Sequence, residues 1–325
     1  MTNIKKAKLI LEAGTVFNGK SFGYPGSTAG EVVFNTAMTG YPESLTDPSY
    51  EGQILITTYP ILGNYGVPPR REKDDVSQYY ESDRIHARAI VAQDYSWEHS
   101  HWQADRSLAQ WLEEEKIPGI YDIDTRALTK LLREKGSMLG KIVVEGAEEP
   151  EFYDPNNENL VAKVSCSEIE HHGHGEKTVV LVDCGTKHNI IRCLTSRGVK
   201  VVRVPWDYDF NTLEYDGLFI SNGPGNPDMV DKTVEHLREA LKKERKAYLR
   251  NLHGQPAPLE SGWRQDLQTQ IWPPQPQPAC APDRHEPLFR DFAEPWLRRR
   301  RHHASRRLGT AVHQHERRHE RGYPP

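Results

Sequence analysis

The pattern of apolar and polar residues predicts a strand-rich region over about the first 150 residues. Short runs of β-branched and aliphatic residues predict strands at about 9–11, 15–17, 31–34, 54–57 and 89–92. Two later segments carry apolar residues at helical spacing instead. One covers about 107–115 and is followed by Pro118, and the other begins at Asp124 as N-cap and ends at Gly136.

From Lys177 onward the pattern changes to alternating strands and helices. Residues 178–182 form an apolar run that is typical of a parallel strand buried on both faces. A helix at about 187–197, strands at 199–205 and 217–220, and a further helix with apolar residues from Val230 to Leu241 follow. This succession predicts the opening of a doubly wound, flavodoxin-like α/β domain that is incomplete. We therefore expect the strand at 217–220 to expose an unpaired edge, which would lower solubility.

Between these two regions, residues 151–176 predict a linker. This segment holds Pro155, an Asn pair and three closely spaced histidines, His171, His172 and His174. A histidine cluster can bind a metal, but neither cysteines nor other ligands accompany it at a suitable spacing. We interpret the segment as a solvated linker and predict no metal site.

Charge and cysteine content narrow the class of protein. A formal net charge of -4 and a pI near 6.4 give no general attraction to nucleic acid or to anionic membranes. The four cysteines form no C-x-x-C pair, and a chain of 325 residues does not need disulfides for stability, which favours the reducing cytosol. No apolar run approaches the ~20 residues that a membrane-spanning helix requires.

Residues 247–325 differ sharply in composition from the rest of the chain. Lysine is absent after Lys246, Arg298–Arg301 are consecutive, and prolines are dense at 273–278. Such a segment cannot supply the missing strands of an α/β sheet, and we expect it to be mostly irregular. Two explanations are possible: a disordered basic arm that binds nucleic acid, or a displaced reading frame.

The sequence itself favours the displaced frame. Synonymous codons for Arg250–Pro256 can be chosen so that translation starting one base later gives the peptide G-I-C-T-G-N-Q. The same offset turns residues 267–278 into Y-K-L-K-Y-G-H-R-S-H-N-Q and the segment from Ala293 into Q-N-H-G-Y-A-V-D. The shifted text has an ordinary globular composition, and G-x-C-x-G has the form of a nucleophile elbow, in which a thiol sits on a tight strand-to-helix turn.

One glycine-rich motif lies in frame, at Ser221–Pro227, directly after a predicted strand. Glycines allow close approach of a ligand, and free backbone N–H groups in such a turn can hold an oxyanion. An ordinary strand-to-helix turn explains the motif equally well when it is taken alone.

Longer strings point to a family. The runs at 40–54 (G-Y-P-E-S-L-T-D-P-S-Y-E-G-Q-I), 63–66 (G-N-Y-G) and 119–129 resemble the N-terminal domain of the carbamoyl phosphate synthetase small chain. The runs at 182–189 and 221–227 resemble the start of its class I glutamine amidotransferase domain. The resemblance implies a β-rich small-chain domain at 1–150, the linker at 151–176, an incomplete amidotransferase domain at 177–246 and out-of-frame residues at 247–325. G-Y-P-E and G-N-Y-G are closer to the eukaryotic pyrimidine-pathway version than to the usual bacterial chain.

The resemblance also implies a chemistry. In this family a cysteine thiolate attacks the amide of glutamine, and a His/Glu pair serves as acid and base. Ser49, Gly223 and Gly225 would contact L-glutamine, whereas Cys184, at the end of a buried strand, is interpreted as a core residue. ATP, Mg and bicarbonate would be used by the synthetase partner, a large chain or a fused domain, so no cofactor is expected here.

The nucleophile and the His/Glu pair have no counterpart in the residues as written. We therefore predict no catalytic residue and no glutaminase activity for this polypeptide. Besides a glutaminase component, a non-catalytic module that docks on the synthetase remains an alternative function. A nucleic-acid-binding arm is the third, and it predicts salt-sensitive binding.

Overall fold

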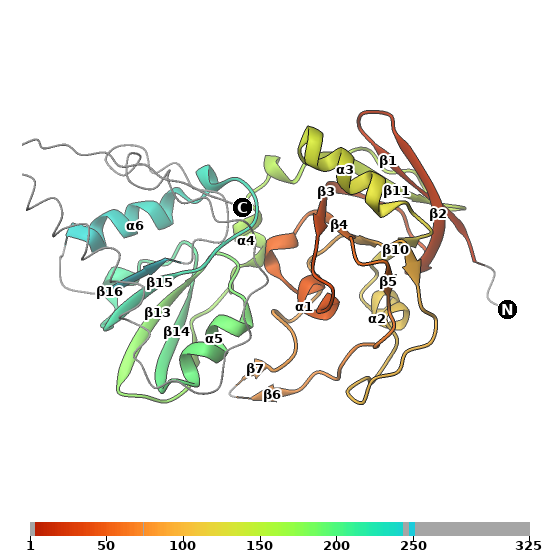
Figure 1. The fold of residues 1–325 in the computed structure, drawn as a ribbon. Coiled ribbons are helices and arrows are strands. Elements are labelled where there is room, and N and C mark those ends of the chain that lie inside the picture. The colour runs from red at the N-terminus through yellow and green to blue at the C-terminus, as the bar shows by residue number, and fades with distance from the viewer. Residues whose placement is uncertain (1–3, 74, 243–246, 251–325) are drawn as a thin grey trace, which may run out of the picture. The chain divides into compact units, whose positions relative to one another are not determined.

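The computed structural model describes residues 4–73, 75–242 and 247–250, all within one compact unit of the chain. Their secondary structure falls into two parts, a closed barrel formed by strands between Lys6 and Val144 and an open sheet formed by strands after residue 169 (Figure 1). No described helix is long and apolar enough to cross a membrane.

The N-terminal part closes into a barrel of mixed parallel and antiparallel strands. Around the barrel the strands follow the order β1 (Lys6–Leu11), β11 (Met138–Val144), β3 (Thr28–Asn35), β4 (Gln53–Thr57), β8 (Ala89–Val91), β10 (Pro118–Tyr121) and β2 (Val16–Gly23). The pairs β3–β4, β4–β8 and β8–β10 are parallel, and the others are antiparallel. Closure leaves this sheet without an open edge, which removes a site for unwanted strand pairing.

Helices complete two apolar cores of the barrel. In the first, Leu128 and Leu132 of α3 (Thr125–Lys135) pack with Leu9, Ile54 and other strand residues. In the second, α1 (Tyr41–Leu45) and α2 (Leu108–Glu114) pack with strand residues such as Phe22, Leu55 and Ile90. Short elements lie between them: η1 (Pro48–Tyr50), β5 (Ile61–Leu62), β6 (Glu72–Lys73), β7 (Val76–Ser77) and β9 (Asp94–Tyr95).

The ends of the two longer barrel helices confirm the sequence prediction. Asp124 caps α3 by accepting a hydrogen bond from the Ala127 backbone N–H at 2.8 Å, and Gly136 follows as C-cap. Helix α2 begins with a capping box, in which Ser107 and Gln110 bond reciprocally to each other's backbone N–H. Local signals were sufficient here because each cap lies within a few residues of the turn it satisfies.

The second part is a sheet with the strand order β12-β14-β13-β15-β16. Its strands are β12 (Glu170–His172), β13 (Lys177–Asp183), β14 (Val199–Pro205), β15 (Gly217–Ile220) and β16 (Ala247–Arg250). All neighbours are parallel except the edge strand β12, which runs antiparallel to β14. The mixed α/β fold that the sequence predicts is confirmed.

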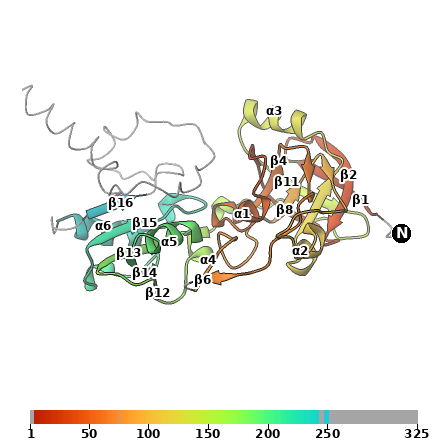
Figure 2. The same ribbon diagram turned by 60° about the horizontal axis from the view of Figure 1, so that its bottom comes forward.

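Helices cover both faces of this sheet (Figures 1 and 2). Helix α5 (His188–Thr195) packs on Leu181 and Val201, whereas α6 (Asp231–Lys242) packs on the opposite face, which holds Val180 and Val182. The remaining short elements are η2 (Pro155–Asn157), α4 (Leu160–Val164), η3 (Phe210–Thr212) and η4 (Pro227–Met229). This layering is the doubly wound arrangement.

Two expectations are corrected. The strand at 217–220 does not expose an open edge, because β16 pairs with it in parallel from Gly217↔Ala247 to Ile220↔Arg250. The segment 247–325 therefore begins with a strand, and its residues after 250 lie outside the described part. The predicted solvated linker also contains α4 and β12, and His172 of β12 is buried because the strand extends the sheet.

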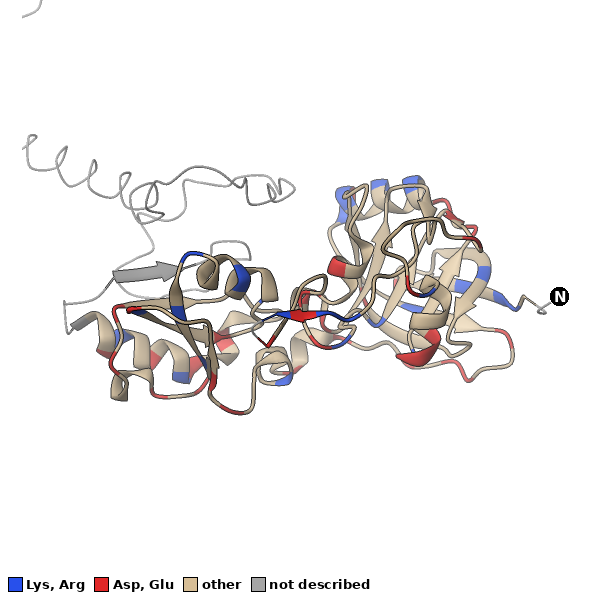
Figure 3. Cartoon of the chain, turned by 90° about the horizontal axis from the view of Figure 1, so that it is seen from below, with Lys and Arg blue, Asp and Glu red and all other residues tan. Residues whose placement is uncertain are grey.

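Charges are mixed over the described residues. Acidic and basic positions are both spread over the barrel and the sheet, as Figure 3 shows for the side seen from below. The small strand β6, for example, consists of one acid and one base, both exposed.

Candidate functional site

The loops that follow β13 and β15 lie side by side because these two strands are parallel neighbours. Ser221, the first residue after β15, accepts a hydrogen bond on its Oγ from the Cys184 backbone N–H at 2.9 Å. The Ser221 backbone N–H in turn donates to the Val182 carbonyl at 3.1 Å. These two bonds hold the glycine-rich loop 221–227 against the loop 184–187, at the carboxyl end of the sheet, where open α/β sheets bind ligands.

Gly223 is held so close to the neighbouring loop that no side chain fits. A Cβ at this position would lie 2.3 Å from the Cys184 carbonyl oxygen and 2.9 Å from Val161. Gly225 has a left-handed φ of 75°, and a Cβ there would lie 3.2 Å from the Leu160 side chain. The N-G-P-G motif is thus fixed by backbone packing against the 184–187 loop and against α4.

Asp183 organises the adjacent loop. Its side chain is fully buried, and its Oδ1 accepts from the backbone N–H groups of Gly185 at 2.9 Å and Thr186 at 2.7 Å. Its Oδ2 accepts from the Cys166 N–H at 2.7 Å and from the Arg203 guanidinium, whose Nη2 lies at 2.6 Å. A buried carboxylate with this many donors is satisfied, and the loop that faces Gly223 is rigid as a result.

The Arg203 guanidinium also binds a second carboxylate. Its Nη1 lies 2.9 Å from Glu170 Oε2, and His172 Nε2 approaches the same oxygen at 3.2 Å. The bond from His172 together with Arg203 lowers the pKa of Glu170 to about 2, against the opposing effect of burial. Burial would lower the pKa of Arg203, but Asp183 and Glu170 raise it above its ordinary value.

Ser49 comes from the barrel, in the 3-10 turn η1. Its backbone N–H donates to Asp47 Oδ1 at 2.9 Å, and Asp47 Oδ2 forms an ion pair with Lys187 Nζ at 2.7 Å. Lys187 directly follows the loop that Asp183 holds. The structure therefore connects the Ser49 turn to the Gly223 loop through Asp47, Lys187 and residues 184–186.

No cysteine of the described residues stands in a nucleophile elbow. Cys184 is a buried member of the sheet's core cluster, as expected. Burial, reinforced by Asp183, raises the pKa of the Cys166 thiol to about 12, so this thiol stays protonated at neutral pH. Cys193 lies half-buried on α5, and Cys280 is outside the described residues.

Sequence reasoning identified the glycine loop and Ser49 but missed the charged residues that fix them, Asp47, Asp183, Lys187 and Arg203. A signal was available in two places. Asp183 ends an apolar strand, and Arg203 interrupts the apolar run V-V-R-V-P. Opposite charges within two apolar strands predict a buried pair, since a single buried charge would be too costly.

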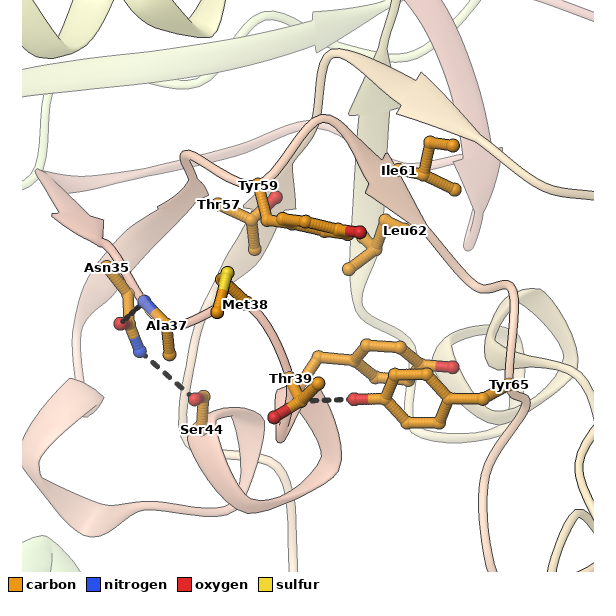
Figure 4. A pocket seen from close by; sticks show the side chains of 11 residues that line it. Asn35, Ala37, Met38, Thr39, Ser44, Thr57, Tyr59, Ile61, Leu62 and Tyr65 are labelled. Atoms are coloured by element: carbon orange, nitrogen blue, oxygen red, sulfur yellow. Dashed lines mark hydrogen bonds between the residues drawn. The ribbon is translucent and has the colours of Figure 1, made fainter. Parts of the chain in front are cut away.

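A small pocket lies elsewhere, on the barrel. Asn35, Met38, Ser44, Tyr59 and Tyr65 are among its lining residues (Figure 4). Asn35 donates to Ser44 Oγ at 3.1 Å, and the Tyr65 hydroxyl accepts from the Tyr41 N–H at 3.0 Å. None of the predicted glutamine contacts lines this pocket. Within the described residues, no group of three or more His, Cys, Asp or Glu side chains could hold a metal ion.

A strand-rich N-terminal part followed by a flavodoxin-like α/β part is the arrangement that the resemblance implies, and the structure adds that the first part is a closed barrel. Residues 9–142 match the family of the carbamoyl-phosphate synthase small chain, CPSase domain, and residues 180–249 match class-I glutamine amidotransferases. Residues 9–142 thus belong to the carbamoyl-phosphate synthase small-chain family, and residues 180–249 belong to the class-I glutamine amidotransferases.

Curated relatives agree over the same region. The chain is 50% identical to carbamoyl-phosphate synthase (ammonia), mitochondrial, of Mus musculus over 245 residues, which cover 74% of this chain and 16% of the relative. It is 49% identical to multifunctional protein pyr1-3 of Dictyostelium discoideum, with coverages of 74% and 12%. For multifunctional protein CAD of Squalus acanthias the identity is 48%, with coverages of 74% and 11%. The matched part thus spans only about a sixth or less of these relatives.

Proposed function

We propose that the gene encodes the glutamine-hydrolysing component of a carbamoyl phosphate synthase. The observation that carries this proposal is the glycine loop at 221–227, which packs on the 184–187 loop in a chain of this family and is linked to the Ser49 turn. Ser49, Gly223 and Gly225 would hold L-glutamine. The ammonia released would go to a synthetase partner, which uses bicarbonate, ATP and Mg.

The reading frame of the chain is displaced by one base after Lys246 in our proposal. Synonymous codons for Ala247–Arg250 can be chosen so that translation starting one base later gives P-I-F-G. The codons of the residues that follow then continue with I-C-T-G-N-Q in the same frame. The match to the amidotransferase family ends at residue 249, which supports a boundary in this region.

Strand pairing supports a position of the shifted cysteine near the glycine loop. Ile220 lies opposite Arg250 in the parallel pair β15–β16, and in the shifted text position 250 is the first glycine of the elbow. The shifted cysteine follows two positions later. Since loops after parallel neighbours emerge at the same edge of a sheet, this cysteine would lie at the edge that carries Gly223.

The chain as written is then inactive, because its nucleophile and its His/Glu pair are missing. The test compares ammonia release from L-glutamine by this chain with release by the chain encoded after removal of one base at the junction of codons 246 and 247 and read on through the His/Glu pair, which we call the frame-restored chain. A matched control replaces the cysteine of the restored G-I-C-T-G-N-Q by serine. Ammonia release by the chain as written would overturn the proposal, and so would an inactive frame-restored chain.

A non-catalytic docking module is the alternative function. The barrel has two apolar cores of its own and a closed sheet, so its structure does not depend on the missing strands. Co-purification of the chain as written with a carbamoyl phosphate synthetase large chain would support docking. If the barrel without the rest of the chain does not co-purify with the large chain, the barrel is not the docking part.

We further propose the pyrimidine pathway rather than the arginine pathway, and the cytosol as the compartment. The forms G-Y-P-E and G-N-Y-G support the pathway, and a sequence with four cysteines but no C-x-x-C pair supports a reducing compartment. The mitochondrial name of the Mus musculus relative makes the compartment worth testing directly, by fractionating cells of the source organism and detecting the protein with an antibody.

A further inference from the structure

The N-terminus of α5 is capped by the barrel rather than by its own sequence. Lys187 is the N-cap residue, and its side chain makes no capping hydrogen bond. The Glu81 carboxylate instead accepts from the Asn189 backbone N–H at 2.9 Å through Oε2, and the Glu81 carbonyl accepts from the His188 N–H at 2.8 Å. Two of the N–H groups that a helix start leaves unpaired are thus satisfied from a distant part of the chain.

The same carboxylate holds the helix from the side. Glu81 Oε1 lies 2.9 Å from Arg192 Nη2, and the two side chains are only 12% and 25% exposed. Arg192 Nη1 also donates to the carbonyls of Tyr80, at 3.0 Å, and of Ser77. Because this ion pair is largely shielded from water and hydrogen-bonded throughout, it fixes an orientation rather than adding a loose surface contact.

On its other side Glu81 is bound to the turn that leads to Ser49. Its backbone N–H donates to Thr46 Oγ1 at 2.9 Å, and the neighbouring Ser82 hydroxyl donates to the Thr46 carbonyl at 2.6 Å. Thr46 is 1% exposed and directly precedes Asp47, which holds the Ser49 backbone. Glu81 therefore contacts both the approach to Ser49 and the helix that follows the 184–187 loop.

We propose that Glu81 is a positioning residue that fixes the Ser49 turn of the barrel relative to the 184–187 loop and the Gly223 loop of the sheet. The inference rests on the proposed function, since it gives this alignment the task of bringing two halves of a glutamine site together. Glu81 itself does not contact the substrate. It acts through Thr46 on one side and through Asn189 and Arg192 on the other.

Hydrogen exchange of the full chain as written tests the connection without any activity. The variant is Glu81→Gln, which keeps the shape of the side chain and removes its charge, and the matched control is Glu113→Gln on the exposed face of α2. We expect exchange to become about tenfold faster in peptides covering 186–192, because the charge-assisted bonds of the Glu81 carboxylate to Asn189 and Arg192 are weakened. We expect the same change in peptides covering 44–50, because residue 81, which bonds to Thr46 through its backbone N–H, is then held less firmly. Strands β1 and β11 should be unaffected, and the control should change none of these regions.

Faster exchange confined to 186–192 would overturn the proposal, because Glu81 would then be a helix cap only, and so would no change in either region. If Glu81→Gln does not fold, Arg192→Lys provides the milder test, since it keeps the charge but loses the forked geometry that reaches Glu81, Tyr80 and Ser77 together.

The frame-restored chain tests the consequence for glutamine. We expect Glu81→Gln to raise KM for glutamine about tenfold with little change in kcat, because the reacting groups stay in place while the Ser49 side of the site is displaced. Unchanged KM and kcat would overturn the role in alignment. If the unsubstituted frame-restored chain releases no ammonia, the proposed function fails, and the exchange experiment still decides whether Glu81 joins the two segments.

Discussion

The pair of Asp183 and Arg203 offers the sharpest test of what holds the sheet and its loops together. We choose Arg203→Met, which preserves the length of the side chain and removes its charge. Asp183, fully buried, would keep its three backbone donors but lose the cation that compensates its charge, and Glu170 would lose its closest guanidinium contact. Removing one partner of a buried pair costs about 3–5 kcal/mol, because the other charge is left uncompensated.

That magnitude is large compared with the roughly 5–15 kcal/mol that stabilises a typical domain. It is measured by native-state hydrogen exchange of peptides covering β13 and β14, whose protection reports the free energy of opening in this sheet alone. We expect protection to fall by more than a hundredfold in these strands and to stay unchanged in the barrel strand β3, which serves as the internal reference.

A double-mutant cycle separates the pair from its surroundings. Asp183→Asn alone keeps an acceptor for the loop but leaves Arg203 with only Glu170. The double variant Asp183→Asn, Arg203→Met should lose less than the sum of the two single losses, by about 1–3 kcal/mol, since neither charge is then stranded. A loss of under about 1 kcal/mol for Arg203→Met, or strict additivity, would refute the view that this pair is shielded from water and organises the loop.

Three further predictions follow from single residues. Gly223→Ala should destabilise the 184–187 loop by about 1–3 kcal/mol, because its Cβ would lie 2.3 Å from the Cys184 carbonyl oxygen; unchanged exchange of peptides over that loop would contradict this. Burial lowers the pKa of His188 from 6.5 to about 4, with Asp83 opposing the shift and Arg203 and Arg192 adding to it. The unfolded chain therefore binds a proton that the folded chain rejects, so stability should fall by up to about 3 kcal/mol as the pH drops from 6.5 to 4, and a His188→Asn variant should lack this slope in urea titrations. Ser107→Ala removes the capping box of α2 and should cost about 1 kcal/mol in thermal unfolding, whereas Ser107→Asp should restore most of it.

Local features were predictable from the sequence, and long-range pairing was not. The start of α3 at Asp124 and its end at Gly136 follow from residues next to each turn, and the apolar run before Asp183 identified β13. Closure of the barrel depends on parallel pairs such as Val32↔Ile54 and Gly119↔Ile90, which join segments that no short pattern connects.

The errors have a common cause. The polar composition around Glu170 and His172 predicts a solvated linker, yet these residues form β12, which pairs with β14, and Glu170 binds Arg203. The composition of 247–325 as a whole predicts an irregular segment, although its first four residues include Tyr248 and Leu249 and form β16. In both cases the average composition of a longer segment conceals a few residues that can pair with a neighbouring strand.

The strand order explains why a displaced base would remove the nucleophile and leave the loops that bind glutamine intact. The loops that would hold glutamine come from η1 and from the ends of β13 and β15, and all of these precede Lys246. The nucleophile of the shifted text comes only after β16, an edge strand of the described sheet. The chain as written should therefore still bind L-glutamine weakly. This binding should be measurable as slower hydrogen exchange in peptides covering 44–50 and 221–227 when L-glutamine is added. If the frame-restored chain binds L-glutamine but the chain as written shows no such slowing, the loops before Lys246 do not form part of the glutamine site on their own. Their geometry would then depend on the G-I-C-T-G-N-Q turn.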